Sequence, residues 1–183
     1  DCPSDFHWGV MAVPDARLYD LGPIRTTLLC DDPALFAAVE GFLLVGSGSW
    51  TEARQLLLEE ALLARARPVL VANPDIIAPR EAGFTAEPGH FAHRLADRTG
   101  IVPRFYGKPF PEIFDLAFAR LDAQVDKARV LMVGDSLHTD VLGAQASGIR
   151  SALVADYGVL AGYDVWQAMA RTGIFPDVVL GRP

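Results

Sequence analysis

Three charged residues in the second half of the chain have types and positions suited to the chemistry of phosphate groups. Asp135 and Asp140 stand five residues apart in VGDSLHTD, directly after an apolar run, and Lys108 lies between Gly107 and Pro109. Carboxylates at the end of a buried strand suit Mg²⁺, which takes oxygen ligands and keeps waters that leave room for a phosphate. An ammonium at the same edge would neutralise a phosphoryl group or an attacking carboxylate. A simpler interpretation stays open, in which Asp135 caps a helix, Asp140 is a solvated first-turn acid and Lys108 is a surface lysine.

The stretch 130–155 predicts the elements that must hold the two acids. Residues 130–133 are apolar and β-rich, as expected for a strand buried on both faces. The Ala- and Gly-rich segment 141–148 predicts a helix that stops at a glycine, and residues 149–155 predict another strand. In open α/β sheets the ligand site lies outside the carboxyl ends of the strands, which is where Asp135 falls.

The rest of the chain alternates short strands with helices. We predict strands at 8–13, 26–30, 41–45, 69–72, 102–106 and 178–180, and helices at 14–21, 33–39, 51–67, 88–99, 111–121 and 163–172. Three separate breakers in 76–87 predict a loop or hairpin. This alternation predicts an α/β fold with βαβ units, a mostly parallel sheet and a domain boundary near residue 103.

Two of these helices have an apolar face that we assign to the core. The face of the helix 51–67 is expected to comprise Ala53, Leu56, Leu57, Leu63 and Ala64. The face of the helix 111–121 is expected to comprise Ile113, Phe114, Ala117, Phe118 and Leu121.

Composition excludes several classes of partner. The chain has 183 residues, is 51% apolar and carries a formal net charge of −7, which argues against nucleic acid because phosphate-backbone binding needs clustered Lys and Arg. No apolar run approaches the roughly 20 residues of a membrane span, and the first residues lack the features of a signal peptide. The two cysteines, Cys2 and Cys30, form neither a metal-type spacing nor a disulfide framework. We therefore expect a cytoplasmic protein.

The motifs together are more specific than any one of them. The second half of the chain resembles the third and fourth motifs of the haloacid-dehalogenase-like hydrolases. The resemblance lies in YGKP at 106–109, the helix after it, VGDSLHTD at 133–140 and the GAQASGI segment. The closer resemblance is to their class IIA phosphatases, which carry a type-2 cap; ANPD at 72–75 resembles part of that cap. The resemblance implies an α/β fold: a doubly wound, Rossmann-like parallel-sheet core, of which this chain holds the C-terminal half, plus an α/β cap. The cap would comprise residues 1–103 and the core residues 104–183.

The same resemblance implies roles for single residues. Lys108 matches the lysine that steadies the nucleophile and the phosphoryl group, Asp135 the acidic Mg²⁺ ligand, and Asp140 the second acid that supports the metal site. The cap segment that faces the substrate matches Asn73, Pro74 and Asp75. His138 lies inside the acidic loop, where we expect it to contact the ligand.

The resemblance implies a Mg²⁺-dependent phosphomonoester hydrolase that acts on a small phosphorylated metabolite, such as a sugar phosphate, through an aspartyl-phosphate. The family's nucleophile and general acid form a D-x-D motif, and no D-x-D occurs in these 183 residues. We therefore expect the nucleophile outside this chain, the chain alone to be inactive, and the strand at 130–133 to have a bare edge without its missing neighbour. The alternative is a non-catalytic metal- or phosphometabolite-binding protein, or a truncated inactive fragment. Capped enzymes of this group often pair, so the resemblance also implies a homodimer through the cap.

Overall fold

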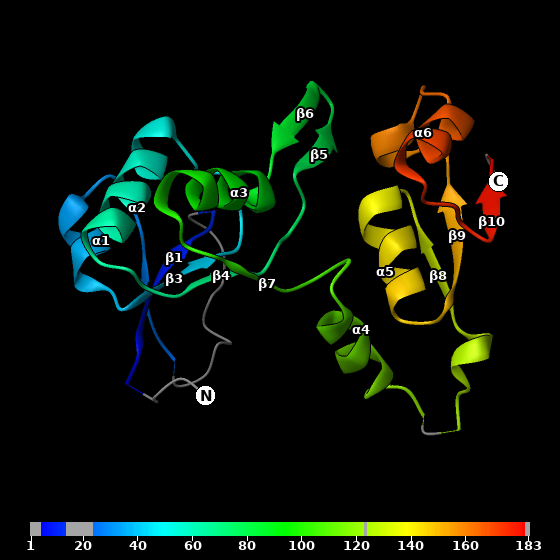
Figure 1. Ribbon diagram of the computed structural model, residues 1–183, viewed down its shortest axis with the longest axis horizontal. Coiled ribbons are helices and arrows are strands. Elements are labelled where there is room, and N and C mark those ends of the chain that lie inside the picture. The colour runs from blue at the N-terminus through cyan, green and yellow to red at the C-terminus, as the bar shows by residue number, and fades with distance from the viewer. Residues whose placement is uncertain (1–4, 14–23, 123, 182–183) are drawn as a thin grey trace. The chain divides into compact units, whose positions relative to one another are not determined.

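The computed structural model describes residues 5–13, 24–122 and 124–181, and the helix predicted at 14–21 lies outside these ranges. Contacts divide the chain into two units (Figure 1). Unit 1 consists of Asp1–Ile77 and Ala86–Tyr106, and unit 2 of Ala78–Thr85 and Gly107–Pro183. Lys108, Asp135 and Asp140 therefore all belong to unit 2.

Unit 1 is built on a parallel sheet, as the alternation of strands and helices predicted. In the described residues its strand order is β2-β1-β3-β4-β7, with every pairing parallel. The strands are β1 (His7–Met11), β2 (Arg25–Leu28), β3 (Gly41–Leu44), β4 (Val69–Val71) and β7 (Arg104–Phe105). The helices are α1 (Pro33–Ala38), α2 (Glu52–Ala64) and α3 (Pro88–Thr99). This strand order is that of flavodoxin-like doubly wound sheets.

Local signals explain where these helices begin and end. The Asp32 side chain accepts a hydrogen bond from the N–H of Ala34, and the Thr51 side chain accepts one from the N–H of Arg54. Both contacts satisfy donors that the first helical turn leaves unpaired. Gly100 adopts a φ of 71° and ends α3, a conformation that costs a glycine little.

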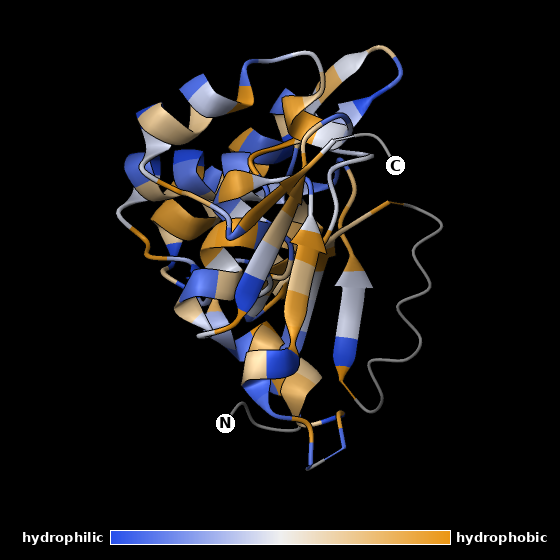
Figure 2. Cartoon of the chain, turned by 90° about the vertical axis from the view of Figure 1, so that its right-hand side faces the viewer, coloured by the Kyte–Doolittle hydropathy of each residue, from blue (hydrophilic) through white to orange (hydrophobic). Residues whose placement is uncertain are grey.

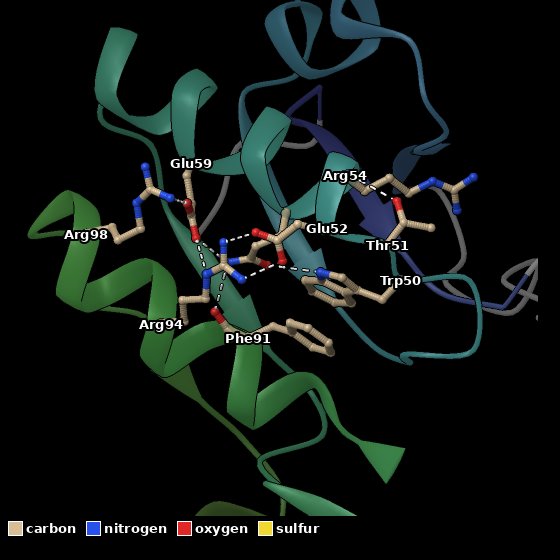
Figure 3. Close-up of polar contacts among 9 residues, drawn as sticks. Trp50, Thr51, Glu52, Arg54, Glu59, Phe91, Arg94 and Arg98 are labelled. Carbon is tan, nitrogen blue, oxygen red and sulfur yellow. Dashed lines mark hydrogen bonds and ion pairs between the residues drawn. The ribbon is translucent and has the colours of Figure 1, made fainter.

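The buried face of α2 agrees with the predicted one only in part: Leu57 is partly buried and packs against the core, but other predicted residues do not. Its buried residues are Gln55, Leu58, Glu59 and Leu62, whereas Leu63 is 60% exposed, and Ala53 and Ala64 are exposed as well. Figure 3 shows the reason: Arg94 and Arg98 of α3 reach the Glu59 carboxylate, at 3.2 and 3.0 Å. Gln55 donates to Glu59 and accepts from the Trp50 indole N–H. Partners from α3, and Trp50 two residues before α2, thus make polar side chains stable inside the interface.

Unit 2 contains a smaller parallel sheet with the strand order β10-β9-β8. Its strands are β8 (Leu131–Gly134), β9 (Arg150–Val154) and β10 (Val178–Leu180). Its helices are α4 (Pro111–Phe118), α5 (Leu142–Ala146) and α6 (Val165–Thr172), with the single turns η2 (Lys127–Arg129), η3 (Leu137–Val141) and η4 (Gly158–Leu160). The predicted hairpin forms a two-stranded sheet of β5 (Ile77–Arg80) and β6 (Gly83–Ala86).

The prediction that the strand at 130–133 is buried on both faces is wrong. Leu131 is 46% exposed and Val133 is 54% exposed. Among the described residues β8 pairs with β9 on one side and with no strand on the other, so it is an edge strand. Figure 2 colours each residue of the chain by its hydropathy, with apolar residues in orange. An apolar run predicts a strand but says nothing about its neighbours.

The core face predicted for the helix 111–121 is also only partly correct. Phe114 is buried, but Ile113 is 40% exposed and Leu121, beyond the end of α4, is 45% exposed. The buried core of unit 2 comprises Leu137, Val141, Leu153, Met169 and Ile174. None of the helices in the described ranges has the length and hydropathy of a membrane span.

Candidate functional site

The structure brings Lys108 and Asp140 together in unit 2, across 32 residues of sequence. Lys108 Nζ lies 2.5 Å from Asp140 Oδ1. The lysine follows β7 in the loop that leads to α4, whereas Asp140 lies in the π-helical turn η3 after β8. The Lys108 side chain is 43% exposed and that of Asp140 only 4%, so the ammonium remains accessible while its partner is enclosed.

The Asp140 carboxylate also organises the loop that carries Asp135. Its Oδ2 atom accepts hydrogen bonds from the backbone N–H groups of Asp135 and Ser136, at 3.0 and 3.1 Å. Gly134 makes room for it, because a Cβ at position 134 would lie 2.1 Å from Asp140 Cγ. Asp140 is therefore not the solvated first-turn acid of the simpler interpretation. Both of its oxygens are occupied by donors of this chain, which suits an orienting role better than metal binding.

Asp135 has a different environment. It is half-buried at the carboxyl end of β8, and among the described residues no hydrogen bond or ion pair engages its carboxylate. It does not act as a side-chain cap of η3 or α5. One carboxylate completed by waters and phosphate oxygens is a common donor set for Mg²⁺. No group of three or more His, Cys, Asp or Glu side chains that could hold a metal ion occurs within the described part of the chain.

His138 lies in the same loop and is exposed. It comes from η3, the turn that also carries Asp140, but its side chain is on the solvent side. The structure therefore leaves the imidazole of His138 accessible to a ligand.

The predicted substrate-facing residues of the first half lie in unit 1, after β4. Asn73 Oδ1 accepts from the N–H of Asp75 at 3.0 Å, which closes a turn. The start of α3 packs on this turn: Gly89 donates its N–H to the Asp75 carbonyl, and a Cβ at position 89 would lie 2.0 Å from the Pro74 carbonyl oxygen. These contacts join Asn73, Pro74 and Asp75 in one turn of unit 1, against the start of α3.

Two contacts, one in each unit, involve residues that no sequence motif had indicated. The Glu87 side chain is buried directly before α3 and accepts a hydrogen bond from Ser47 Oγ at 3.0 Å. Gly158, in the loop after β9, lies against the Asp135 carboxylate. Both contacts join residues that are distant in the chain, so no local pattern points to either.

A comparison with known families and proteins adds to this geometry. Residues 105–177 match the family model described as HAD-hydrolase-like. The chain is 39% identical over 109 residues to the D-glycerol 3-phosphate phosphatase of Mycobacterium tuberculosis, a match that covers 59% of this chain and 30% of the relative. It is 39% identical over 77 residues to the acid sugar phosphatase of Staphylococcus haemolyticus, covering 42% of this chain and 28% of that protein.

Solved structures are similar over nearly the whole chain. The p-nitrophenyl phosphatase from Archaeoglobus fulgidus matches with a TM-score of 0.75 and 23% identity, covering 96% of this chain and 64% of that one. The glycerol phosphate phosphatase from M. tuberculosis in complex with magnesium matches with a TM-score of 0.70 and 25% identity, covering 99% of this chain and 51% of that one. The chain thus spans about a third of the first curated relatives, and between half and two thirds of these structures.

Proposed function

We propose that this chain is part of a haloacid-dehalogenase-like hydrolase similar to the class IIA phosphatases, and that the protein hydrolyses small phosphomonoesters with the help of Mg²⁺. One observation carries the proposal. An accessible lysine, a buried orienting aspartate and an aspartate whose carboxylate binds no other described residue meet at the carboxyl end of β8. The relatives named above as sugar and glycerol phosphate phosphatases suggest a phosphorylated polyol or sugar as the substrate.

Each residue of this site has a separate task in the proposed reaction. Lys108 binds the transferring phosphoryl group and offsets its negative charge. Asp140 holds the Lys108 ammonium in place and fixes the backbone on which Asp135 is mounted. Asp135 holds Mg²⁺, which when bound neutralises charge on the phosphoryl oxygens.

The nucleophile in this proposal is an aspartate outside this chain, and the intermediate is an aspartyl-phosphate. Among the described residues β8 pairs with β9 alone, and its unpaired edge supports a further strand beside β8, where such a residue would face the site. We assign the α/β cap to residues 1–103 and the second half of the core to residues 104–183. Asn73, Pro74 and Asp75 of that cap, and His138 of the core, are proposed to contact the substrate.

The experiment is release of phosphate from p-nitrophenyl phosphate and from glycerol and sugar phosphates by the intact gene product. We expect turnover that requires Mg²⁺ and that is lost in Asp135→Asn and Lys108→Ala. Binding of a phosphorylated metabolite without turnover would favour a non-catalytic binding protein instead. Full activity of both variants would refute the assignment of the site. Light scattering on the same preparation tests the homodimer that the resemblance implies.

A further inference from the structure

The Asp135 carboxylate lies against a glycine from the neighbouring strand connection. Asp135 follows β8, and Gly158 stands four residues beyond the end of β9, at the start of η4. The two strands are parallel and paired, with Gly134 opposite Leu153. Their carboxyl ends therefore open at the same edge of the sheet, which brings the two loops together.

The contact leaves no space for a side chain at position 158. A Cβ built there would lie 1.4 Å from Asp135 Oδ2 and 2.3 Å from Asp135 Cγ. The carboxylate thus fills the volume that the side chain of any other residue would take. Substitution of Gly158 must rotate the Asp135 side chain or displace the loop.

Positive φ alone does not explain this close approach. Gly158 has a φ of 71°, and Gly148, Gly162 and Gly173 have similar values of 70°, 80° and 69°. A Cβ at any of these three would meet nothing within 4 Å. Gly158 therefore differs from these three glycines in having the Asp135 carboxylate as its neighbour. Gly162, four residues along the same loop, is a matched control for the strain of a side chain at positive φ.

Asp135 is consequently constrained at two points. Asp140 accepts a hydrogen bond from its backbone N–H, and Gly158 limits the space around its carboxylate. No hydrogen bond or ion pair among the described residues sets the direction of that carboxylate, so steric contact is the remaining restraint.

We propose that Gly158 is a positioning residue for Asp135. Because Gly158 has no side chain, the loop after β9 approaches the Asp135 carboxylate closely and holds it in the orientation that binds Mg²⁺. The part that concerns Mg²⁺ rests on the function proposed above. The contact itself does not depend on it. Groups that orient a metal ligand typically change metal affinity by about 10–100-fold when they are substituted.

The contact is tested by the stability of four variants of the intact protein: Gly158→Ala, Gly162→Ala, Asp135→Ala and the double variant Gly158→Ala/Asp135→Ala. Gly162→Ala measures the strain of a side chain at positive φ, which we expect to lower the Tm by roughly 2–8 °C. Gly158→Ala should lower it further, and the excess should vanish in the Asp135→Ala background. An equal effect of Gly158→Ala in both backgrounds would overturn the contact.

The role in metal binding is tested by calorimetric titration with Mg²⁺ alone. Gly158→Ala should weaken the Mg²⁺ affinity by about tenfold or more, with no change in Gly162→Ala. Raising the Mg²⁺ concentration should restore phosphate release in Gly158→Ala, which a purely structural defect would not allow. Unchanged affinity in Gly158→Ala overturns the positioning role. No Mg²⁺ binding by the unsubstituted protein overturns the proposed function and this role together, while the stability cycle still decides the contact.

Discussion

Substitution of the three charged residues of the site should affect stability very unequally. In Asp140→Asn the ion pair with Lys108 is lost and the amide group faces the ammonium, while the two backbone N–H groups keep only a neutral acceptor. Hydrogen bonds to a charged group contribute about 1.5–3 kcal/mol each and neutral ones about 1 kcal/mol. Lys108 is 43% exposed and is resolvated by water, which reduces the loss. We expect Asp140→Asn to lower the free energy of unfolding by about 3 kcal/mol.

The other two substitutions provide the comparison. Lys108→Met leaves Asp140 with both of its backbone donors, so the expected cost is about 1–2 kcal/mol. Asp135→Asn removes no hydrogen bond of the described residues, and we expect a change within about 0.5 kcal/mol. Activity should nevertheless be lost in all three variants, because each residue has a task in the proposed reaction.

Urea unfolding followed by circular dichroism gives the three free energies, and amide hydrogen exchange gives a local measure. The backbone N–H groups of Asp135 and Ser136 should exchange faster in Asp140→Asn, since they lose a charged acceptor. A cost for Asp135→Asn equal to that for Asp140→Asn would refute this division of roles. So would a cost for Asp140→Asn below about 1 kcal/mol, which is the size of one neutral hydrogen bond.

Three further outcomes follow from contacts in the two units. Burial lowers the pKa of the Arg67 guanidinium, which donates hydrogen bonds to the backbone carbonyls of Phe36 and Val39. Lysine has fewer donors, so Arg67→Lys should reduce the free energy of unfolding, measured in urea, by about 2–4 kcal/mol. Hydrogen bonds from Ser151 hold the pKa of the Asp177 carboxyl below its usual range. The contact therefore stabilises the fold fully at a pH above the ordinary carboxyl pKa, and this stabilisation is lost as the pH falls through the lowered pKa of Asp177. Asp177→Asn should make the free energy of unfolding depend less on pH in this acidic window. Val133→Lys, on the strand edge that is exposed in this 183-residue chain taken alone, should leave the urea midpoint of that chain nearly unchanged and reduce its self-association in light scattering.

Elements defined by their own residues were predictable from sequence. The caps at Asp32 and Thr51 and the end of α3 at Gly100 depend on side chains and backbone angles within one turn of the chain. Parallel strands followed from alternation with helices of suitable length, and the sheets confirm them. Such features require no knowledge of distant neighbours.

Burial was predicted less well because it depends on partners elsewhere in the chain. Glu59 lies inside the α2–α3 interface since Arg94 and Arg98 supply positive charge from α3, a fact that the α2 sequence does not contain. Val133 has the composition of a buried strand residue, yet it is exposed on the described chain because β8 lies at the edge of its sheet. Apolar periodicity locates the face of an element but cannot say what covers it.

The acid pair shows the same limit within a single motif. The spacing of Asp135 and Asp140 predicted one direct metal ligand and one supporting acid, but identical side chains on one short loop gave no reason beyond the resemblance to choose between them. Lys108, 32 residues earlier, and the adjacent backbone amides occupy both oxygens of Asp140. Gly158, on the next strand connection, encloses Asp135 without giving it a hydrogen-bond donor. Donors already satisfy both oxygens of the Asp140 carboxylate, whereas no described residue donates to the Asp135 carboxylate, which keeps its lone pairs for a cation. The difference in environment is therefore the physical reason to assign the metal to Asp135 and the support to Asp140.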